Sequence, residues 1–360
     1  MPAVEVSDVT TLARVPAPGT DATERVVRSV TDATSGFEGE GFPVRRAFAG
    51  VELADLDPFV HLDQMGPVEY APGEAKGTAW HPHRGFESVT YIIDGSFEHQ
   101  DNTGGGGTIT SGGTQWLTTG AGVLHVERPS EALVTAGGPF HGLQLWVNLP
   151  RSRKFSEPRY QDLPGDDSVV LASDDGGALV RLIAGTIGDT DGPADTNSPV
   201  AVLHAILRAD AELRLPWRAD FNALVYVLTG DGTIGSGASA RPLSSGQLAV
   251  LGTGDVIALT AGGEQGLDVM VLGGVPIREP VIWGGPFVMN SREEVHKAFD
   301  EYECGGFGPI PGSGAAPATA PGAGRPRASL AAATSRITRT PWTERKALLK
   351  RVLADRPAGR

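Results

Sequence analysis

Short apolar runs separated by turn residues recur along most of the chain. The segments VTYII (89–93), WVNL (146–149), LVYVL (224–228) and LAVL (248–251) each lie between clusters rich in Gly, Asp or Asn. Runs of this length are typical of strands, and frequent turn residues between them favour antiparallel pairing. The pattern therefore predicts an all-β fold.

One segment shows the pattern of a helix. In NSREEVHKAFDEYECGG, Ser291 and Glu294 have the spacing of a capping box, and Val295, Phe299 and Tyr302 form an apolar stripe. Gly305 and Gly306 follow the stripe and are typical of a helix end. We expect a single helix here that docks on the β domains.

The chain contains an internal repeat. The segment 78–99 aligns without a gap with the segment 213–234, so that Tyr91 matches Tyr226 and Gly95 matches Gly230. Two tandem β domains of one design follow from this repeat. His81, His83 and Glu87 fall opposite Pro216, Arg218 and Asn222, and His125 and Glu127 fall opposite Ile257 and Leu259. The polar site of the first copy is therefore expected to be absent from the second.

The length of 360 residues suits two domains with additional chain. Both ends are rich in Pro, Ala, Gly, Ser and Thr, with few large apolar side chains, which is typical of disorder. We expect a disordered segment 1–24, a metal-binding domain 25–150, a metal-free domain with the helix at 151–312, and a disordered linker and tail 313–360.

Charge and cysteine content limit the function classes. The net charge is −13, but 325–360 carries +8, which leaves the remainder at −21. An acidic body does not suit direct binding of nucleic acid. The single cysteine, Cys304, excludes an internal disulfide and fits a reducing compartment. Without an apolar segment of signal-peptide or membrane-spanning length, the expected location is the cytoplasm.

The most informative residues are two pairs with strand spacing. His81 and His83 project to one side of a strand, as do His125 and Glu127. Two such strands facing each other would form a mononuclear metal site with open coordination positions, suited to Fe(II), Mn, Co, Ni, Cu or Zn. The alternative is a pair of surface histidines beside a proline. The second His-x-Glu pair, and the loss of both pairs from the repeat, favour the metal site.

Four segments within about 28–308 resemble the pirin family of the cupin superfamily. They are HPHRGFESVTYIIDGSFEHQD, TQWLTTGAGVLHVE, LQLWVNLP and REPVIWGGPFVMNSREEV. The resemblance implies a bicupin: two jelly-roll β-barrels, a metal only in the N-terminal one, and a C-terminal helix packed on the body. By position it implies His81, His83, His125 and Glu127 as ligands, usually of iron. Other cupins take their carboxylate from the position of Glu87, which has the same strand parity as His81 and His83 and which we interpret here as a group supporting the site. Gln115, Trp116, His99 and His141 also lie in motifs of the family, and for the last three we expect ordinary packing.

The resemblance implies two functions. Bacterial pirins are commonly described as quercetin 2,3-dioxygenases, which fits an open metal position, O₂ and a polyphenol substrate, with Glu127 or Glu87 accepting the phenol proton. Other pirins are described as regulators, so the alternative is a non-catalytic iron or redox sensor that acts through protein partners.

The basic tail lies beyond the resemblance. Thr340 and Pro341 suit a helix start, and Leu348, Leu349, Val352 and Leu353 share one face, so a short basic amphipathic helix is expected to about 354. Its possible destinations are the acidic body, an anionic membrane surface or a nucleic acid. We favour docking on the acidic body, and the alternative is a solvated tail without a role.

Overall fold

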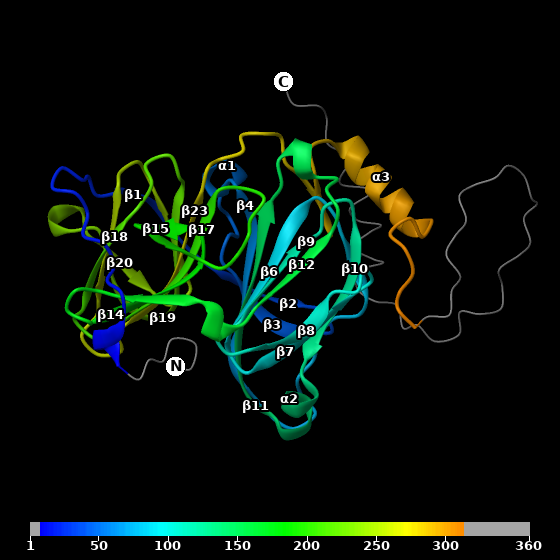
Figure 1. Cartoon of the computed structure of the whole chain (residues 1–360), viewed down its shortest axis with the longest axis horizontal. Helices are drawn as coiled ribbons and strands as arrows, with labels where there is room; N and C mark the ends of the chain where they lie inside the picture. Colours follow the sequence, from blue (N-terminus) through cyan, green and yellow to red (C-terminus); the bar gives the residue numbers. More distant parts are fainter. Residues whose placement is uncertain (1–7, 313–360) are drawn as a thin grey trace, which may run out of the picture.

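Two β domains lie side by side in the structure, a computed structural model that describes residues 8–312 (Figure 1). The N-terminal domain, coloured blue to blue-green, holds the first copy of the repeat, and the C-terminal domain, green to yellow, holds the second. The predicted tail helix lies outside the described residues.

The N-terminal domain consists of a large and a small antiparallel sheet. The large sheet has the strand order β12-β9-β6-β11-β4-β3-β2 and the small sheet β5-β10-β7-β8. Their bounds are β2 (Thr34–Glu38), β3 (Phe42–Arg46), β4 (Phe59–Tyr70), β5 (His81–His83), β6 (Phe86–Asp94), β7 (Ser96–Asp101), β8 (Gly106–Thr110), β9 (Thr114–Thr118), β10 (Val123–Pro129), β11 (Gly138–Asn148) and β12 (Arg159–Leu163). Two short helices, α1 (Leu53–Leu56) and α2 (Glu131–Ala136), lie between strands.

The C-terminal domain repeats this arrangement. Its main strand order is β1-β21-β19-β23-β17-β14-β13, with β18 and β20 attached through β22 and β19. The bounds are β1 (Val27–Asp32), β13 (Val169–Ala172), β14 (Ala178–Ala184), β17 (Val200–Leu207), β18 (Glu212–Pro216), β19 (Ala223–Ile234), β20 (Arg241–Ser244), β21 (Gln247–Leu251), β22 (Val256–Ala261) and β23 (Leu267–Gly274). A small ribbon, β15 (Thr186–Ile187) and β16 (Thr190–Asp191), lies beside it.

The two domains exchange strands. β1 precedes the N-terminal domain in the chain but pairs with β21, whereas β12 follows that domain and pairs with β9. The predicted boundary at 150 therefore divides the sequence into two parts, but each large sheet contains strands from both parts. Each domain completes its large sheet with a strand from the other side of the boundary.

Residues 8–24, for which we expected disorder, lie along the C-terminal domain. Val15 is buried in that domain's core, and its backbone N–H donates to the carbonyl of Ala172. Glu24 forms an ion pair with Arg214 and accepts a hydrogen bond from Ser236. A segment too polar to form its own core can thus still become ordered by packing on the surface of a folded domain.

The two copies of the repeat meet across a shared core. Tyr91 on β6 and Tyr226 on β19, aligned by the repeat, belong to one apolar cluster with residues of both large sheets. The Tyr91 hydroxyl lies 2.7 Å from Nδ1 of His204 in the C-terminal domain, and the Tyr226 hydroxyl donates to Oε1 of Gln64 in the N-terminal domain at 2.7 Å. The predicted tandem repeat is therefore confirmed, and its equivalent tyrosines bond reciprocally across the interface.

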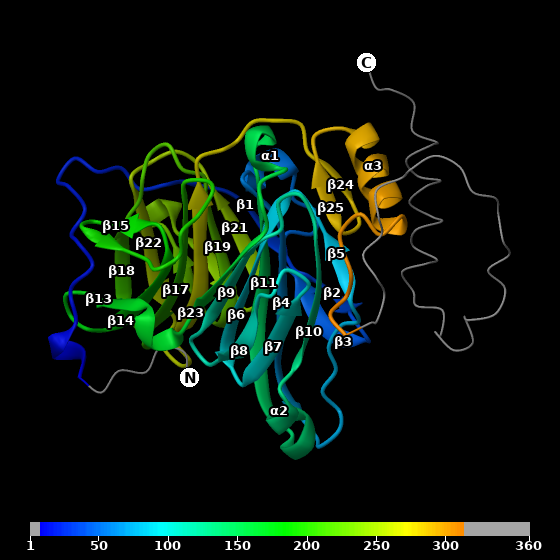
Figure 2. The same cartoon turned by 45° about the vertical axis from the view of Figure 1, so that its right-hand side comes forward.

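The predicted helix is α3 (Arg292–Glu303), with both hydrogen bonds of the capping box formed by Ser291 and Glu294. After the last strand of the C-terminal domain the chain crosses back through β24 (Ile282–Gly284) and β25 (Phe287–Met289). Figure 2 shows these strands and α3 on the side of the N-terminal domain that holds β5. Val295 and Phe299 of α3 pack with Leu124 of β10, so the C-terminal segment covers the sheet that carries the histidine pairs. Within residues 8–312 every helix is too short or too polar to span a bilayer.

Candidate metal centre

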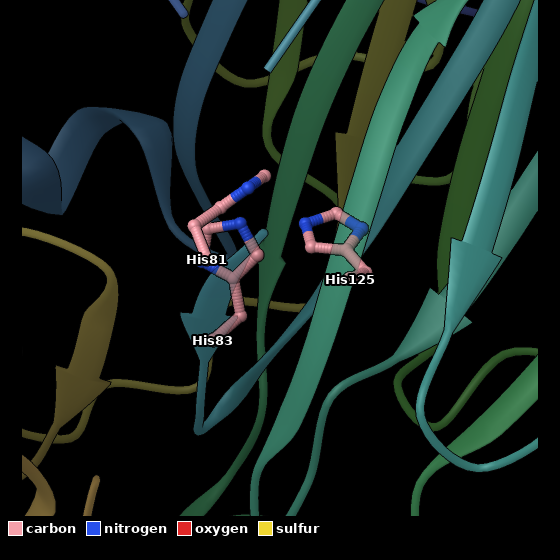
Figure 3. A group of neighbouring side chains, drawn as sticks. All are labelled: His81, His83 and His125. Carbon is pink, nitrogen blue, oxygen red and sulfur yellow. The ribbon is translucent and has the colours of Figure 1, made fainter. Parts of the chain in front are cut away.

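Three predicted ligands converge on neighbouring strands of the small sheet. β5 and β10 run antiparallel, with His125 directly opposite His81 and Val123 opposite His83. This register places all three imidazoles on one face, as Figure 3 shows. The ring centroids are 4.2 Å apart for His81 and His125, 4.7 Å for His81 and His83, and 4.8 Å for His83 and His125.

The hydrogen bonds of the three rings leave one nitrogen of each available. Nδ1 of His81 lies 2.8 Å from the carbonyl oxygen of Ala79, and Nδ1 of His83 lies 3.2 Å from that of Pro286. Nδ1 of His125 lies 3.3 Å from Nδ1 of His99. Nε2 of His125 is buried and has no hydrogen-bond partner, which is costly for a polar atom unless a ligand satisfies it. The ligand nitrogens of the three rings lie within 4.8 Å of one another and could hold one metal ion.

The surroundings keep these rings neutral. Desolvation lowers the pKa of His81, and it lowers the pKa values of His83 and His125 well below the ordinary histidine value. Only a neutral imidazole has a lone pair to give to a metal. The electrostatics of the site therefore suit a cation and not three additional protons.

The predicted fourth ligand, Glu127, projects from β10 beside the triad. Its Oε1 accepts a hydrogen bond from Thr90 at 2.8 Å and its Oε2 accepts one from Gln144 at 2.7 Å. Glu127 is not within the tight group of His81, His83 and His125 but belongs to a second group with His99 and His125. Each carboxylate oxygen keeps a further lone pair, so these two hydrogen bonds orient Glu127 without exhausting its capacity as an acceptor.

Glu87 lies on the face of β6 that points away from the three histidines and Glu127. Thr90 of β6 reaches Glu127 inside the N-terminal domain, whereas Val89 and Tyr91 face the core shared with the C-terminal domain. Glu87 has the parity of the latter, and its Oε1 accepts from Thr118 at 2.9 Å and from Asn197 at 2.8 Å. From the sequence we expected Glu87 to share the strand parity of His81 and His83. The chain turns at Arg84 and Gly85 between β5 and β6, so the parity is not carried over.

The residues expected to pack have different environments. Trp116 is fully buried in the shared core, and His141 contacts Gln64 there. Gln115 is buried on β9. His99 differs, because it is buried beside His125 and bonds to Asp101. Sequence reasoning missed this pair, although the spacing His-x-Asp on the strand next to His125 was a signal for it.

The strand that carries His81 and His83 is held at its end by a buried lysine. Nζ of Lys154 donates to the carbonyl oxygens of Gly85 and Val288 and to Oδ1 of Asn148, at 2.7 to 2.8 Å. Gly85 has a φ of +89°, and a Cβ atom there would lie 2.1 Å from the Val288 carbonyl oxygen. Only glycine permits this approach, which joins the end of β5 to the C-terminal segment.

Arg84 makes a second connection to that segment. Its guanidinium forms an ion pair with Glu301 of α3 at 2.7 Å and lies 4.4 Å from the centre of the Phe307 ring. The two contacts hold the turn after His83 against α3 and against the segment that follows it.

The C-terminal domain has no equivalent site among residues 8–312. Neither group of potential ligands includes a residue of that domain. At the positions matching the histidines, Pro216 ends β18 and Arg218 pairs with Asp220. Asn222, opposite Glu87 in the repeat, donates to the carbonyl of Asp57.

The comparisons with known proteins agree with this architecture. Residues 41–147 match the family model described as Pirin, and residues 202–308 match the model of the pirin C-terminal cupin domain. A Pseudomonas aeruginosa protein named "Putative quercetin 2,3-dioxygenase PA2418" is 39% identical over 79% of this chain and 98% of its own. A pirin-like protein of Solanum lycopersicum is 38% identical over 74% of this chain and 88% of its own. The crystal structure of quercetin 2,3-dioxygenase from Acinetobacter baumannii is 36% identical, covers 79% of this chain and 99% of its own, and superposes with a TM-score of 0.75. The chain is therefore an all-β bicupin and belongs to the pirin family.

Proposed function

We propose that this chain is a metal-dependent dioxygenase that cleaves flavonols such as quercetin at the 2,3 bond. The metal would be held by Nε2 of His81, His83 and His125, with a carboxylate oxygen of Glu127 completing the set. The observation that carries the proposal is the buried, unpartnered Nε2 of His125 beside two further imidazoles whose Nδ1 atoms are the hydrogen-bonded nitrogens.

Iron(II) is the metal that we propose, since three nitrogens and one carboxylate with open positions suit it; Mn, Co, Ni, Cu and Zn accept similar donors. When bound, such a metal supplies Lewis acidity and a binding place for O₂ beside the substrate. The protein's contribution is to hold neutral imidazoles in a fixed, largely buried cluster.

Glu127 is the proposed proton acceptor. Its carboxylate lies two residues from His125 on the same strand and is oriented by Thr90 and Gln144. A carboxylate in this place could take the proton of a phenolic hydroxyl as the substrate binds. Glu87 has no part in the proposal because its bonds to Thr118 and Asn197 direct it toward the C-terminal domain.

Aromatic side chains beside the imidazoles support a planar substrate. The ring of Trp146 lies 5.1 Å from that of His83, and Trp283 of β24 lies 5.8 Å from Trp146. Trp283 is 42% exposed, and its Nε1 donates to the carbonyl of Gly285, which fixes the ring. Exposed aromatic surface of this kind is suited to contact with a flat polyphenol.

The test is anaerobic loading with Fe(II), followed by measurement of O₂ uptake and CO release with and without quercetin. The proposal predicts one O₂ consumed and one CO released for each quercetin cleaved. Metal-loaded protein that leaves quercetin and O₂ unchanged would contradict the enzymatic proposal and favour the sensor instead.

A further inference from the structure

The carboxylate of Asp101 is held by three hydrogen bonds to one of its two oxygens. This residue ends β7 and is buried, with 1% of its surface exposed. Its Oδ1 accepts from the backbone N–H and the hydroxyl of Thr103, both at 2.7 Å, and from the backbone N–H of Gly105 at 2.9 Å. The turn between β7 and β8 thereby fixes the orientation of the carboxylate.

The other oxygen of Asp101 faces His99. Oδ2 lies 3.3 Å from Nε2 of His99, and a carboxylate can only accept at that contact. Nε2 of His99 must therefore carry a proton, and in a neutral ring this leaves Nδ1 as the acceptor. The Tyr160 ring stacks on His99 at 5.2 Å with an interplanar angle of 16°, which holds the plane of the imidazole.

His99 in turn fixes the protonation pattern of His125. Their Nδ1 atoms lie 3.3 Å apart, so one of the two must donate. Since Nδ1 of His99 is the acceptor, Nδ1 of His125 carries the proton and its Nε2 carries the lone pair. That Nε2 is the buried nitrogen without a partner, next to His81 and His83.

We infer that Asp101 and His99 form a positioning pair that holds His125 in the tautomer able to bind the metal. This inference rests on the proposed metal site. A supporting carboxylate and histidine behind a metal-bound imidazole set its orientation and its basicity.

His99 could instead be a ligand in the second group, together with His125 and Glu127. A metal placed there would break the hydrogen bond between His99 and His125. A metal at Nε2 of His81, His83 and His125 breaks none of the bonds described above. The geometry therefore favours the supporting role for His99.

Asp101→Asn is a selective test, because the turn controls how the new amide lies. Its oxygen is expected to stay with the donors of Thr103 and Gly105, which turns the NH₂ group toward His99. His99 would then accept at Nε2 and donate from Nδ1, forcing His125 into the opposite tautomer. An Asp-to-Asn change can disable a histidine in this way while leaving its position intact.

The experiment has two readouts. In metal-free protein, ¹H–¹⁵N NMR of the imidazoles should show the Nδ1–H tautomer of His125 in the wild type and the Nε2–H tautomer in Asp101→Asn. Titration with Ni(II), followed by calorimetry, should show affinity lower by about 10- to 100-fold in the variant. Glu98→Gln is the matched control, because Glu98 lies on the same strand but pairs with Arg128 at the surface, and it should change neither readout.

His99→Phe provides a second variant in case Asp101→Asn does not fold. It keeps a ring beside Tyr160, removes the acceptor for His125, and should also weaken Ni(II) binding. Unchanged tautomers and affinity in Asp101→Asn would overturn the inference, as would spectroscopic evidence that His99 itself binds the metal. Failure of the wild type to bind any metal would instead overturn the proposed site, while the tautomer measurement would still stand.

Discussion

His81 and His125 are directly opposed partners in the antiparallel pair of β5 and β10, with their ring centroids 4.2 Å apart. Side chains at such positions share one face of a sheet and lie close together. Because His83 follows two residues later on the same face, a three-residue strand suffices to complete the triad. The arrangement of the proposed metal centre is thus a consequence of strand register.

The first prediction concerns the triad. Replacing His81, His83 or His125 by Ala should abolish or strongly reduce metal binding while the fold persists, because the domain core lies elsewhere. Elemental analysis and circular dichroism of the three variants check this. Full metal content in all three would refute the assignment.

The second prediction separates the two carboxylates. Glu127→Ala should weaken metal affinity by about 10-fold or more, as expected for the loss of a ligand or of a group that orients one. Glu87→Ala should retain the metal and lower stability instead, because Thr118 and Asn197 lose their buried acceptor. Metal titration and chemical unfolding of both variants distinguish these effects. The reverse result would place the carboxylate ligand at Glu87.

The third prediction concerns substrate binding. Trp283→Ala should raise KM for quercetin with little change in metal content, because the indole contacts Trp146 and His61 and not the three proposed histidine ligands. Phe37→Ala is the control, since Phe37 is 66% exposed on β2. Equal KM values for the two variants would exclude Trp283 from the substrate site.

The fourth prediction is a pH dependence caused by Lys154. Burial lowers the pKa of its ammonium group to about 7. Between pH 7 and about 10.5 the unfolded chain therefore carries one proton more on Lys154 than the folded chain does. The free energy of unfolding should therefore rise with pH in this range through Lys154, by about 1.4 kcal/mol per pH unit where the difference is complete. Urea unfolding at several pH values should show this rise in the wild type relative to Lys154→Met. Parallel pH profiles would show that Lys154 does not titrate in this way.

The fifth prediction addresses the interface between the domains. Tyr226→Phe should lower the free energy of unfolding by about 1 to 2 kcal/mol, because the Gln64 amide oxygen loses its buried donor. Tyr91→Phe should have a similar effect through His204. Denaturant unfolding checks both, and stabilities equal to the wild type would show that these bonds do not hold the domains together.

Much of this fold could be predicted from the sequence because its signals are local. The capping box of Ser291 and Glu294 and the alignment of Tyr91 with Tyr226 require only neighbouring residues or a comparison of the chain with itself. The exchange of β1 and β12 between the sheets could not be predicted, since pairing partners distant in sequence leave no local pattern. Residues 8–24 likewise gain order only from the surface of the C-terminal domain.

The candidate site, too, could be predicted from the sequence only in part. The spacing of His81 and His83 predicted that their side chains share a face, because alternate residues of a strand do so. From the sequence we expected the strand of His125 to face theirs across the barrel, whereas the two strands are neighbours in one sheet. The position of Glu87 depended on the turn at Gly85, whose φ of +89° changes the direction of the chain between β5 and β6. The inferred role of His99 depended on the register of β7 against β10, which places His99 opposite Glu127 and Asp101 opposite His125.

The most direct test of the metal centre is anomalous diffraction at the metal absorption edge from crystals of the metal-loaded protein. We expect one peak in each chain, about 2.0 to 2.2 Å from Nε2 of His81, His83 and His125, with a carboxylate oxygen of Glu127 at a similar distance. The proposed metal centre would be contradicted by a peak bonded to Nδ1 of His99, by a peak in the C-terminal domain, or by protein that takes up no metal.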